Sequence, residues 1–338
     1  MSAERDLEHC RAAIKTGSRS FYAASHLLPK QACDDALALY AFCRLADDAV
    51  DLHDEKAAAV LRLRARLDAA YAGTPQDSPA DRAFGRMIER TEMPKTLPDA
   101  LIEGLAWDAQ EREYQTLSGV RDYSARVAAA VGAMMTVLMG VRDQNTLARA
   151  CDLGVAMQLT NIARDVGEDA RMGRIYLPHD WLREEGVDAD ALRTNPQHSK
   201  ALARCIARLL AEARRLYIRS EAGIARLPIR CRPAIFACRE IYAAIGDEIA
   251  RNRHNSIDTR AHTSGTQKVA LVGRSMMRSA FVTLGPKEAT HYAPPLPEVA
   301  YLVDAAAHPE RGTPPHRIER FLAVLNELEN RERGSAAV

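Results

Sequence analysis

The sequence predicts an all-α protein, and three observations support this fold class. Ala, Leu and Arg are frequent, and these residues favour helix over strand. Apolar residues recur at intervals of three and four along most of the chain, which is the period of an amphipathic helix. No segment shows the sustained apolar–polar alternation that is typical of a half-buried strand. Hydrophobic residues form 47% of the 338 residues, so the chain can build a sizeable core.

The N-terminal half is expected to form helices separated by short turns. Helical periodicity covers about residues 4–16, and Gly17 ends this helix. The polar residues 18–22 are expected to form a loop that caps a helix or contacts a ligand. Apolar spacing then predicts helices at 30–53 and 56–72, and a segment rich in Gly and Pro at 73–79 predicts a turn. Further helices are expected at 80–92, 98–116 and 120–141.

The C-terminal half continues the helical pattern and then changes character. A helix is expected through 158–169, Pro178 interrupts the pattern, and 180–194 is expected to be a short helix and a loop. Longer helices follow at 198–226, 232–253 and 267–283, and the last of these is both apolar and basic. Residues 286–338 contain several prolines and are expected to form a tail with a short helix near 316–330, outside a main domain of residues 1–285.

Composition excludes several classes of protein. The formal charge of +1 gives no overall field that would attract nucleic acid, so any anion site must be local. The seven cysteines are scattered without CxxC spacing and indicate reduced, mostly buried thiols in a cytoplasmic protein. The charged N-terminus does not resemble a signal peptide. The most apolar run, residues 127–141, is shorter than the roughly 20 residues that cross a bilayer, so we expect a buried helix there.

Residues 158–169 carry a row of oxygen-bearing side chains on one helix face. Asn161, Asp165 and Asp169 recur every four residues, which keeps them on the same side over two turns. Like charges at this spacing repel, so the row fits either a solvated acidic face or a hard-cation site. Mg²⁺ prefers carboxylate and amide oxygens. The nearby Arg164 and Arg174 would meet an anion that the metal also meets, which indicates a phosphate-bearing substrate.

A second row of similar design lies more than a hundred residues earlier. Asp47 and Asp51 are one turn apart at the end of the expected 30–53 helix, and Arg44 precedes them by about one turn. Two acidic faces of matching design are stronger evidence than one. Helices that present these faces to each other could hold several Mg²⁺ ions, and those ions could hold a diphosphate.

Small residues form a stripe on the expected 120–141 helix. The stripe comprises Ala129, Gly132, Ala133, Thr136 and Gly140. Such a stripe either allows close helix packing or leaves room for a long apolar ligand, and the sequence leaves both interpretations open.

Five segments, in this order and at compatible spacings, resemble the squalene/phytoene synthase family. The resemblance covers about residues 10–285 and is greatest to the bacterial phytoene synthases of that family. The segments are Ser18-Arg-Ser-Phe21, Tyr40-Ala-Phe-Cys-Arg44, Asp47-Asp-Ala-Val-Asp51, Gln158-Leu-Thr-Asn-Ile-Ala-Arg-Asp-Val-Gly-Glu-Asp169 and Arg174-Ile-Tyr-Leu-Pro178.

The resemblance implies a single-domain isoprenoid-synthase helical bundle around a deep central cavity, formed by residues 1–285. It also implies a role for each matching residue. The implied metal ligands are Asp47, Asp48 and Asp51 in one set and Asn161, Asp165 and Asp169 in the other. The implied diphosphate ligands are Arg44, Arg164 and Arg174, with Arg19 on a flexible flap, while Tyr40, Phe21, Gln158 and Tyr176 shape the reaction chamber. The residues expected to carry the chemistry are Asp47, Asp51, Asp165, Arg164 and Tyr40.

The resemblance further implies head-to-head condensation of two geranylgeranyl diphosphates to phytoene through prephytoene diphosphate. This reaction would use Mg²⁺, or Mn²⁺ as a substitute, and no nicotinamide cofactor. The alternative is a squalene or dehydrosqualene synthase that acts on farnesyl diphosphate, although Val50 stands where squalene synthases carry Glu. Ser124-Ala-Arg126 stands where the family often has aromatic residues, so a tyrosine proposed to assist the chemistry in relatives has no clear equivalent here. The oily product suggests peripheral contact with a membrane, and the oligomeric state stays open.

Other classes of function fit the sequence less well. A di-iron carboxylate bundle would need two Glu-x-x-His motifs. The chain has one such motif, Glu288-Ala-Thr-His291, and it lies in the tail. A non-catalytic helical scaffold would not need two acidic rows that each have their own arginine.

Overall fold

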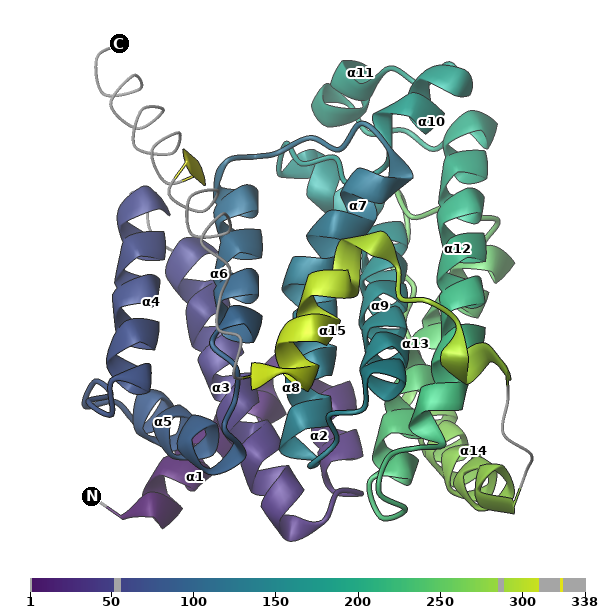
Figure 1. Cartoon of the computed structure of the whole chain (residues 1–338). Helices are drawn as coiled ribbons and strands as arrows, with labels where there is room; N and C mark the ends of the chain where they lie inside the picture. The colour runs from purple at the N-terminus through teal and green to yellow at the C-terminus, as the bar shows by residue number, and fades with distance from the viewer. Residues whose placement is uncertain (1, 52–55, 285–288, 310–322, 325–338) are drawn as a thin grey trace.

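The computed structural model describes residues 2–51, 56–284, 289–309 and 323–324. Some side chains inside these ranges, among them those of Arg19, Asp47 and Asp51, lie outside the description. Within the described ranges the chain consists of helices and connecting segments without a β-strand, which confirms the predicted all-α class (Figure 1). The helices are α1 (Ala3–Gly17), α2 (Arg19–Ser25), α3 (Lys30–Asp51), α4 (Lys56–Tyr71), α5 (Pro79–Thr91), α6 (Thr96–Ala109), α7 (Leu117–Ser124), η1 (Ala125–Ala129), α8 (Ala130–Leu138), α9 (Gln144–Arg171), α10 (His179–Glu184), α11 (Ala189–Thr194), α12 (Lys200–Ile224), α13 (Arg232–Arg251), α14 (Gly265–Leu284), η2 (Ala289–Tyr292), η3 (Pro297–Val299) and α15 (Ala300–Ala307).

The segment 18–22 is not the loop that the sequence predicts. Gly17 does end α1, but α2 begins directly afterwards at Arg19. The hydroxyl oxygen of Ser18 accepts a hydrogen bond from the backbone N–H of Phe21 at 3.3 Å. Ser18 is therefore the N-cap of a new helix, and its extended backbone turns the chain between α1 and α2.

The expected 120–141 helix is divided into three parts. α7 leads into the π-helical turn η1, and α8 then continues to Leu138. At this turn the side chain of Arg126 is fully buried, pairs with Glu103 at 3.0 Å and lies 4.0 Å from the ring centroid of Trp107. The buried pair joins η1 to α6. Hydrophobic spacing does not distinguish a π turn from an α-helix, so the sequence did not indicate this division.

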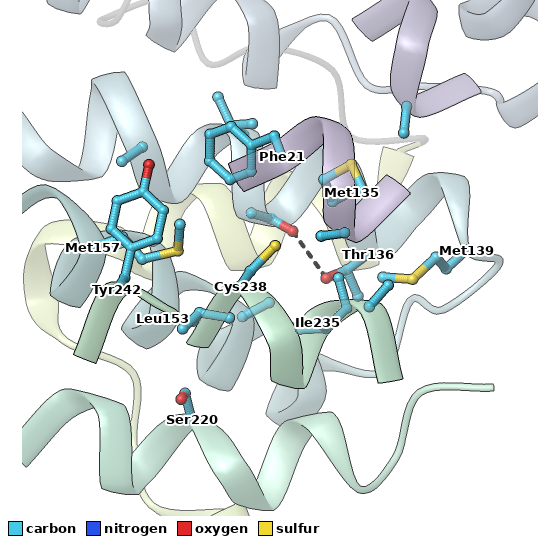
Figure 2. Close-up of a pocket in the computed structure, with 18 of the residues that line it drawn as sticks. Phe21, Met135, Thr136, Met139, Leu153, Met157, Ser220, Ile235, Cys238 and Tyr242 are labelled. Carbon is cyan, nitrogen blue, oxygen red and sulfur yellow. Dashed lines mark hydrogen bonds between the residues drawn. The ribbon is translucent and has the colours of Figure 1, made fainter. Parts of the chain in front are cut away.

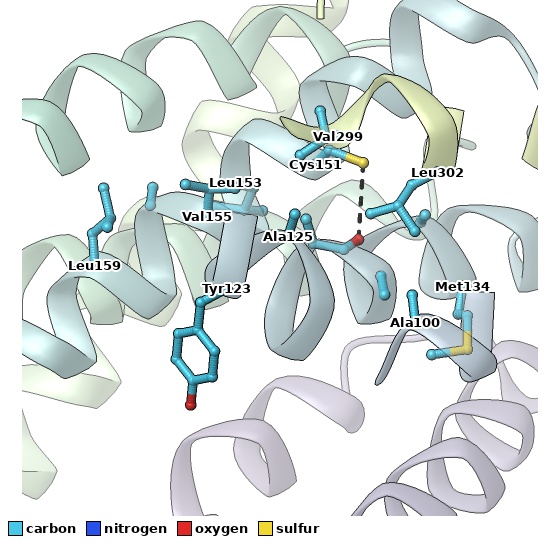
Figure 3. Close-up of a cluster of buried hydrophobic side chains, with 14 of the residues drawn as sticks. Ala100, Tyr123, Ala125, Met134, Cys151, Leu153, Val155, Leu159, Val299 and Leu302 are labelled. Atoms are coloured by element: carbon cyan, nitrogen blue, oxygen red, sulfur yellow. Dashed lines mark hydrogen bonds between the residues drawn. The ribbon is translucent and has the colours of Figure 1, made fainter. Parts of the chain in front are cut away.

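Helix α9 is the centre of the bundle and packs against α12, α8, η1, α13 and α15. Gly154 allows the close approach to η1, because a Cβ atom there would stand 2.6 Å from the Cα of Ala129. Figure 3 shows the apolar cluster around this crossing, which includes Cys151 and Leu302. The thiol of Cys151 donates a weak hydrogen bond to the carbonyl oxygen of Ala129 at 3.9 Å.

Residues 289–309 pack against the bundle, although the sequence predicts that they belong to the C-terminal tail. Val299 and Leu302 are fully buried. The guanidinium of Arg149 donates to the carbonyl oxygens of Thr290 at 2.6 Å and Pro294 at 3.3 Å. The short helix expected near 316–330 falls almost entirely outside the described residues.

Two composition-based expectations can be compared with the structure. All seven cysteines are free thiols, and Cys10, Cys151, Cys205 and Cys231 are buried, as expected. Burial raises the pKa of the Cys10 thiol to about 11, which keeps it protonated and unreactive at neutral pH. In the described part of the chain, no helix has the length and apolar character needed to cross a membrane.

The contact at Gly154 predicts a stability effect. We expect Gly154→Ala to lower the free energy of unfolding by about 1–3 kcal/mol, because the added methyl group overlaps the η1 backbone. Gly273→Ala is the matched control, since a Cβ atom there meets no heavy atom within 4 Å and Ala favours helix. Urea denaturation of both variants measures the difference. An unchanged midpoint for Gly154→Ala would contradict the close approach.

Candidate active site

The second acidic row lies on the C-terminal half of α9, where two arginines neutralise its central residue, Asp165. Arg164 forms a two-pronged ion pair with Asp165, with nitrogen–oxygen distances of 2.8 and 2.6 Å. Arg260 donates to the same carboxylate at 2.8 Å and lies 3.1 Å from a carboxylate oxygen of Glu168. Burial acts to raise the pKa of Asp165, but the hydrogen bonds from the two arginines outweigh burial and hold the pKa below its usual value.

Arg260 reaches the row because Gly167 lets a distant loop approach α9. A Cβ atom at Gly167 would stand 2.7 Å from the carbonyl oxygen of Ser256, and the Gly167 N–H donates to that oxygen at 3.0 Å. One turn later, Arg171 donates to the carbonyl oxygen of Ile257 at 2.8 Å. Sequence reasoning missed Arg260. A single cation in a polar loop has no spacing relation to the row, and the only signal was a glycine inside the acidic helix.

Asn161 and Asp169 occupy the two ends of the row. The side-chain oxygen of Asn161 is buried and has no hydrogen-bond partner among the described residues. Burial raises the pKa of Asp169 to about 7, and the negative charge of Asp165 adds to the shift. One oxygen that lacks a donor and one carboxylate that lacks sufficient neutralisation are what a row of hard-cation ligands presents before the cation binds.

The row does not enclose a metal ion by itself. Among the side chains that the structure describes, no group of three His, Cys or acidic residues converges on one point. Further oxygen ligands would have to come from across the site. The donor set of Asn161, Asp165 and Asp169 therefore fits a hard divalent cation that is shared with a second element or with a bound phosphate.

The first acidic row is described only in part. Arg44 pairs with Asp48 at 2.6 and 3.1 Å, and both side chains are about half exposed. The side chains of Asp47 and Asp51 lie outside the description, as does that of Arg19. Positions 47 and 51 follow Tyr40 and Cys43 at helical spacing on α3, and those two residues line the cavity described next.

A large apolar cavity of about 320 Å³ extends from the Asn161 end of the row into the bundle. Its wall is built from α2, α3, η1, α8, α9, α12 and α13, and Figure 2 shows Met135, Met157 and Ile235 among the side chains around it. The face that α9 contributes spans four turns, or about 22 Å at 1.5 Å per residue. This face consists of Thr146, Arg149, Ala150, Leu153, Gly154, Met157, Gln158 and Asn161.

Aromatic rings surround the end of the cavity nearest the acidic row. The ring of Phe21 stacks on Tyr242 with centroids 5.7 Å apart and meets the edge of Tyr40 at 6.5 Å. The amide of Asn161 donates to the side-chain oxygen of Gln158 at 3.3 Å. The structure thus places Phe21, Tyr40 and Gln158 on the cavity wall. Tyr242 was not singled out as a site residue, and burial raises its pKa to about 12, so its hydroxyl stays protonated.

Tyr176 and Arg174 lie in a different place, a polar cleft of about 270 Å³ beside Asp169. The hydroxyl of Tyr176 donates to Asp108 at 2.7 Å, and the hydroxyl of Tyr123 donates to the other oxygen of the same carboxylate at 2.9 Å. The rings of Tyr176 and Tyr123 stack with centroids 5.1 Å apart. Tyr176 therefore lies in this polar cleft and is not among the residues that line the apolar cavity.

The stripe of small residues serves both of the purposes that the sequence left open. Ala129 and Ala133 are fully buried in helix packing and do not line the cavity. Gly132 and Thr136 do line it, and Thr136 turns its hydroxyl back to the carbonyl oxygen of Gly132 at 2.9 Å (Figure 2). The remaining member, Gly140, has a φ of 78° and ends the helical segment.

The raised pKa of Asp169 predicts a pH-dependent stability difference in protein kept free of metal with EDTA. A carboxyl whose folded pKa exceeds its unfolded value of 3.8 destabilises the fold increasingly as the pH rises from about 4 to 7. We expect Asp169→Asn to raise the free energy of unfolding at about pH 8 by roughly 1–4 kcal/mol, at about 1.4 kcal/mol per pKa unit. The gain should vanish near pH 4. Thermal unfolding at both pH values measures it, and Asp304→Asn, at an exposed site on α15, is the control.

Comparison with known proteins places the chain in a family. The squalene/phytoene synthase family profile matches residues 14–267. A phytoene synthase of Cereibacter sphaeroides is 56% identical over 98% of this chain and 96% of its own length, and one of Rhodobacter capsulatus is 54% identical over 99% of each. A solved dehydrosqualene synthase, in complex with a ligand, superposes with a TM-score of 0.77 at 30% identity and covers 82% of this chain and 98% of its own. The chain therefore belongs to the squalene/phytoene synthase family.

Proposed function

We propose that this protein is a phytoene synthase that condenses two molecules of geranylgeranyl diphosphate head to head. The observation that carries the proposal is the junction at Asn161 and Gln158. There a row of carboxylates and arginines meets an apolar cavity whose α9 face is about 22 Å long. The first end suits a diphosphate with its cations, and the second suits a long prenyl chain. The high identity to relatives named phytoene synthase supports the same reaction.

The charged end binds and releases the diphosphate group. Arg164 and Arg260 form a pair of guanidinium groups at the carboxylate of Asp165, and each keeps further N–H donors for phosphate oxygens. Arg44 adds a half-exposed cation on α3. Asn161, Asp165 and Asp169 on α9, together with Asp47, Asp48 and Asp51 on α3, would hold Mg²⁺, with Mn²⁺ as a substitute. Bound Mg²⁺ would supply the positive charge that stabilises the departing diphosphate.

The apolar end protects the carbocation that remains when diphosphate leaves. Its wall is mainly aliphatic, and it includes Leu39, Val131 and Leu153, whose side chains have no lone pair that could attack a cation. An apolar wall of this kind disfavours water near the cation. The rings of Phe21, Tyr40 and Tyr242 present π faces near the junction, where the positive charge forms. Condensation through prephytoene diphosphate releases two diphosphates and two protons. No electrons are exchanged, so the reaction needs no nicotinamide cofactor.

The second candidate is a dehydrosqualene or squalene synthase that acts on farnesyl diphosphate. The superposition with a solved dehydrosqualene synthase supports this candidate. Incubation with C15 or C20 diphosphate, with and without NADPH, separates the two. A C40 product formed from the C20 substrate without NADPH supports our proposal, and exclusive use of the C15 substrate overturns it.

Turnover should depend on the acidic row, whereas folding should not. We expect EDTA to abolish turnover, and added Mg²⁺ to restore it. Asp165→Asn should lower kcat by at least about a hundredfold, because the variant loses a ligand and a charge where the diphosphate departs. Its helical circular dichroism should stay at the wild-type level, since the carboxylate contributes no apolar packing. Asp304→Asn, on α15, is a control away from the row. Normal turnover of Asp165→Asn would show that the active site lies elsewhere.

The arginines should be distinguishable by their geometry. Arg164→Lys keeps a charge but loses the fork that meets both oxygens of Asp165, so we expect a clear loss of turnover and a larger one for Arg164→Ala. Arg260→Ala should also reduce turnover, because it uncovers the same carboxylate. Steady-state kinetics with the C20 substrate measure both effects. Wild-type rates in all three variants would show that these arginines have no role in the reaction.

Chain length should be controlled at the inner part of the cavity rather than at Ala133. Ala150 lines the cavity on α9, about three turns from Asn161 and away from the diphosphate end. Ala150→Phe should suppress turnover of the C20 substrate by at least about tenfold and spare a C15 substrate, because the last isoprene unit loses its space. Ala133→Phe is the contrast, since it disturbs packing and should affect both substrates alike. Equal C15/C20 rate ratios in the two variants would contradict this assignment.

A further inference from the structure

The outer face of α14 exposes large apolar side chains. Val269 and Phe281 are each 74% exposed, and Met276 and Met277 are 55% and 62% exposed. These residues are spaced so that they share one side of the helix. The opposite side, which includes Ser275 and Ser279, is buried where α14 packs against α13. Apolar groups that gather in this way on an otherwise polar surface mark a binding face.

A second exposed apolar group lies at the same end of the molecule. The turn between α12 and α13 exposes Ile229 at 62%. Helices α13 and α14 are antiparallel, since Arg278 reaches Glu240 at 2.6 Å and lies 5.6 Å from the ring of Phe236. Phe281 is one turn further along α14, and the start of α13 is one turn before Phe236. The Phe281 end of α14 therefore lies beside the turn that carries Ile229.

The charge of this surface is positive on balance. Residues 221–240 and 265–284 contain seven Lys or Arg residues and two Glu residues, and α14 itself contains no Asp or Glu. Both Glu residues, Glu221 and Glu240, form ion pairs with Arg239 and Arg278, while Arg230 and Arg274 are exposed. A helix with an exposed apolar face and basic neighbours has the composition of a segment that lies in the interface of an anionic bilayer.

The same turn closes the inner end of the apolar cavity. Ile224 and Leu227 before the turn and Ala234 and Ile235 after it all line the cavity. Ile229, between them, faces the solvent. The turn is therefore a short segment with the apolar cavity on one side and the exposed apolar surface on the other.

We propose that the exposed face of α14, together with the turn at residues 228–230, docks on an anionic lipid bilayer. The inference rests on the proposed function, because the C40 hydrocarbon must leave an apolar cavity for an apolar phase. Docking here places the inner end of the cavity against the bilayer, so that the product passes the turn without crossing water. The described tail residue Val324 contacts Gln110 at the end of α6, on the other side of the molecule from α14 (Figure 1).

Co-flotation with lipid vesicles tests the proposal on the full chain. The vesicles contain phosphatidylcholine with or without phosphatidylglycerol. We expect the wild type to float with the anionic vesicles and to be released by high salt. Met277→Ser combined with Phe281→Ser should lower the floated fraction about tenfold. Leu61→Ser, at a 40% exposed site on α4, is the matched control and should float like the wild type.

A second variant and two further readouts make the result decisive. Arg230→Glu combined with Arg274→Glu keeps the apolar face and should also lose binding to anionic vesicles. Sedimentation without lipid shows whether the serine variant changes oligomeric state. Turnover in detergent, where docking is not needed, should be unchanged in both double variants and reports on the proposed function separately.

The possible outcomes differ for the two proposals. Wild-type flotation of both double variants, or no flotation of the wild type, overturns docking by this surface. Conversion of a dimer to a monomer by the serine substitutions, without vesicle binding by the wild type, assigns the face to a second copy of the chain. If both double variants lose flotation but the wild type makes no C40 product, the docking proposal stands and the proposed reaction is overturned.

Discussion

The positions of the acidic rows are unfavourable for the helices that carry them. Asp165, Glu168 and Asp169 lie in the last two turns of α9, and positions 47, 48 and 51 lie in the last turns of α3. The C-terminal end of a helix has a partial negative charge, so carboxylates there oppose the helix dipole as well as one another. A helix is stabilised when cations, rather than carboxylates, lie at its C-terminal end. The rest of the site follows from the need to compensate this accumulation of negative charge.

The protein supplies only part of that compensation. Arg164 and Arg260 neutralise Asp165, but the neighbouring Asp169 keeps a pKa raised to about 7. The side-chain oxygen of Asn161 finds no donor among the described residues. Both groups would gain from a cation that is not part of the chain. If the proposed function holds, a site built in this way would bind cation and diphosphate together more strongly than either alone, since each would neutralise charge that the other leaves.

The elements that the sequence predicted well are those with strong local signals. The long helices, the two acidic rows and the matching segments depend on spacing within one helix. The structure agrees with most of the predicted helices to within a few residues. It differs at 18–22 and 98–141, begins α9 already at Gln144, forms a second helix at Ala189–Thr194 and has short helices within 289–307. What was missed depends on contacts between distant segments. Arg260 acts on Asp165 only because the loop at Ser256 packs on Gly167, and Tyr242 joins Phe21 across two helices. A single sequence holds no local trace of such contacts.

Tyr176 shows why a residue's place in a matching segment does not fix its place in the site. It follows Arg174 closely in sequence, but its ring stacks on Tyr123 and its hydroxyl binds Asp108, outside the apolar cavity. Asp108 accepts from two tyrosine hydroxyls, so its negative charge is held by neutral donors near Asp169 and adds to the raised pKa there. The carboxylate of Asp108 in the polar cleft thus adds negative charge near Asp169, which is the end of the row furthest from the apolar cavity. For the substrate of the proposed function, this gradient of charge would favour an orientation in which the diphosphate lies towards Asp169 and the prenyl chain points away from it, along the apolar face of α9.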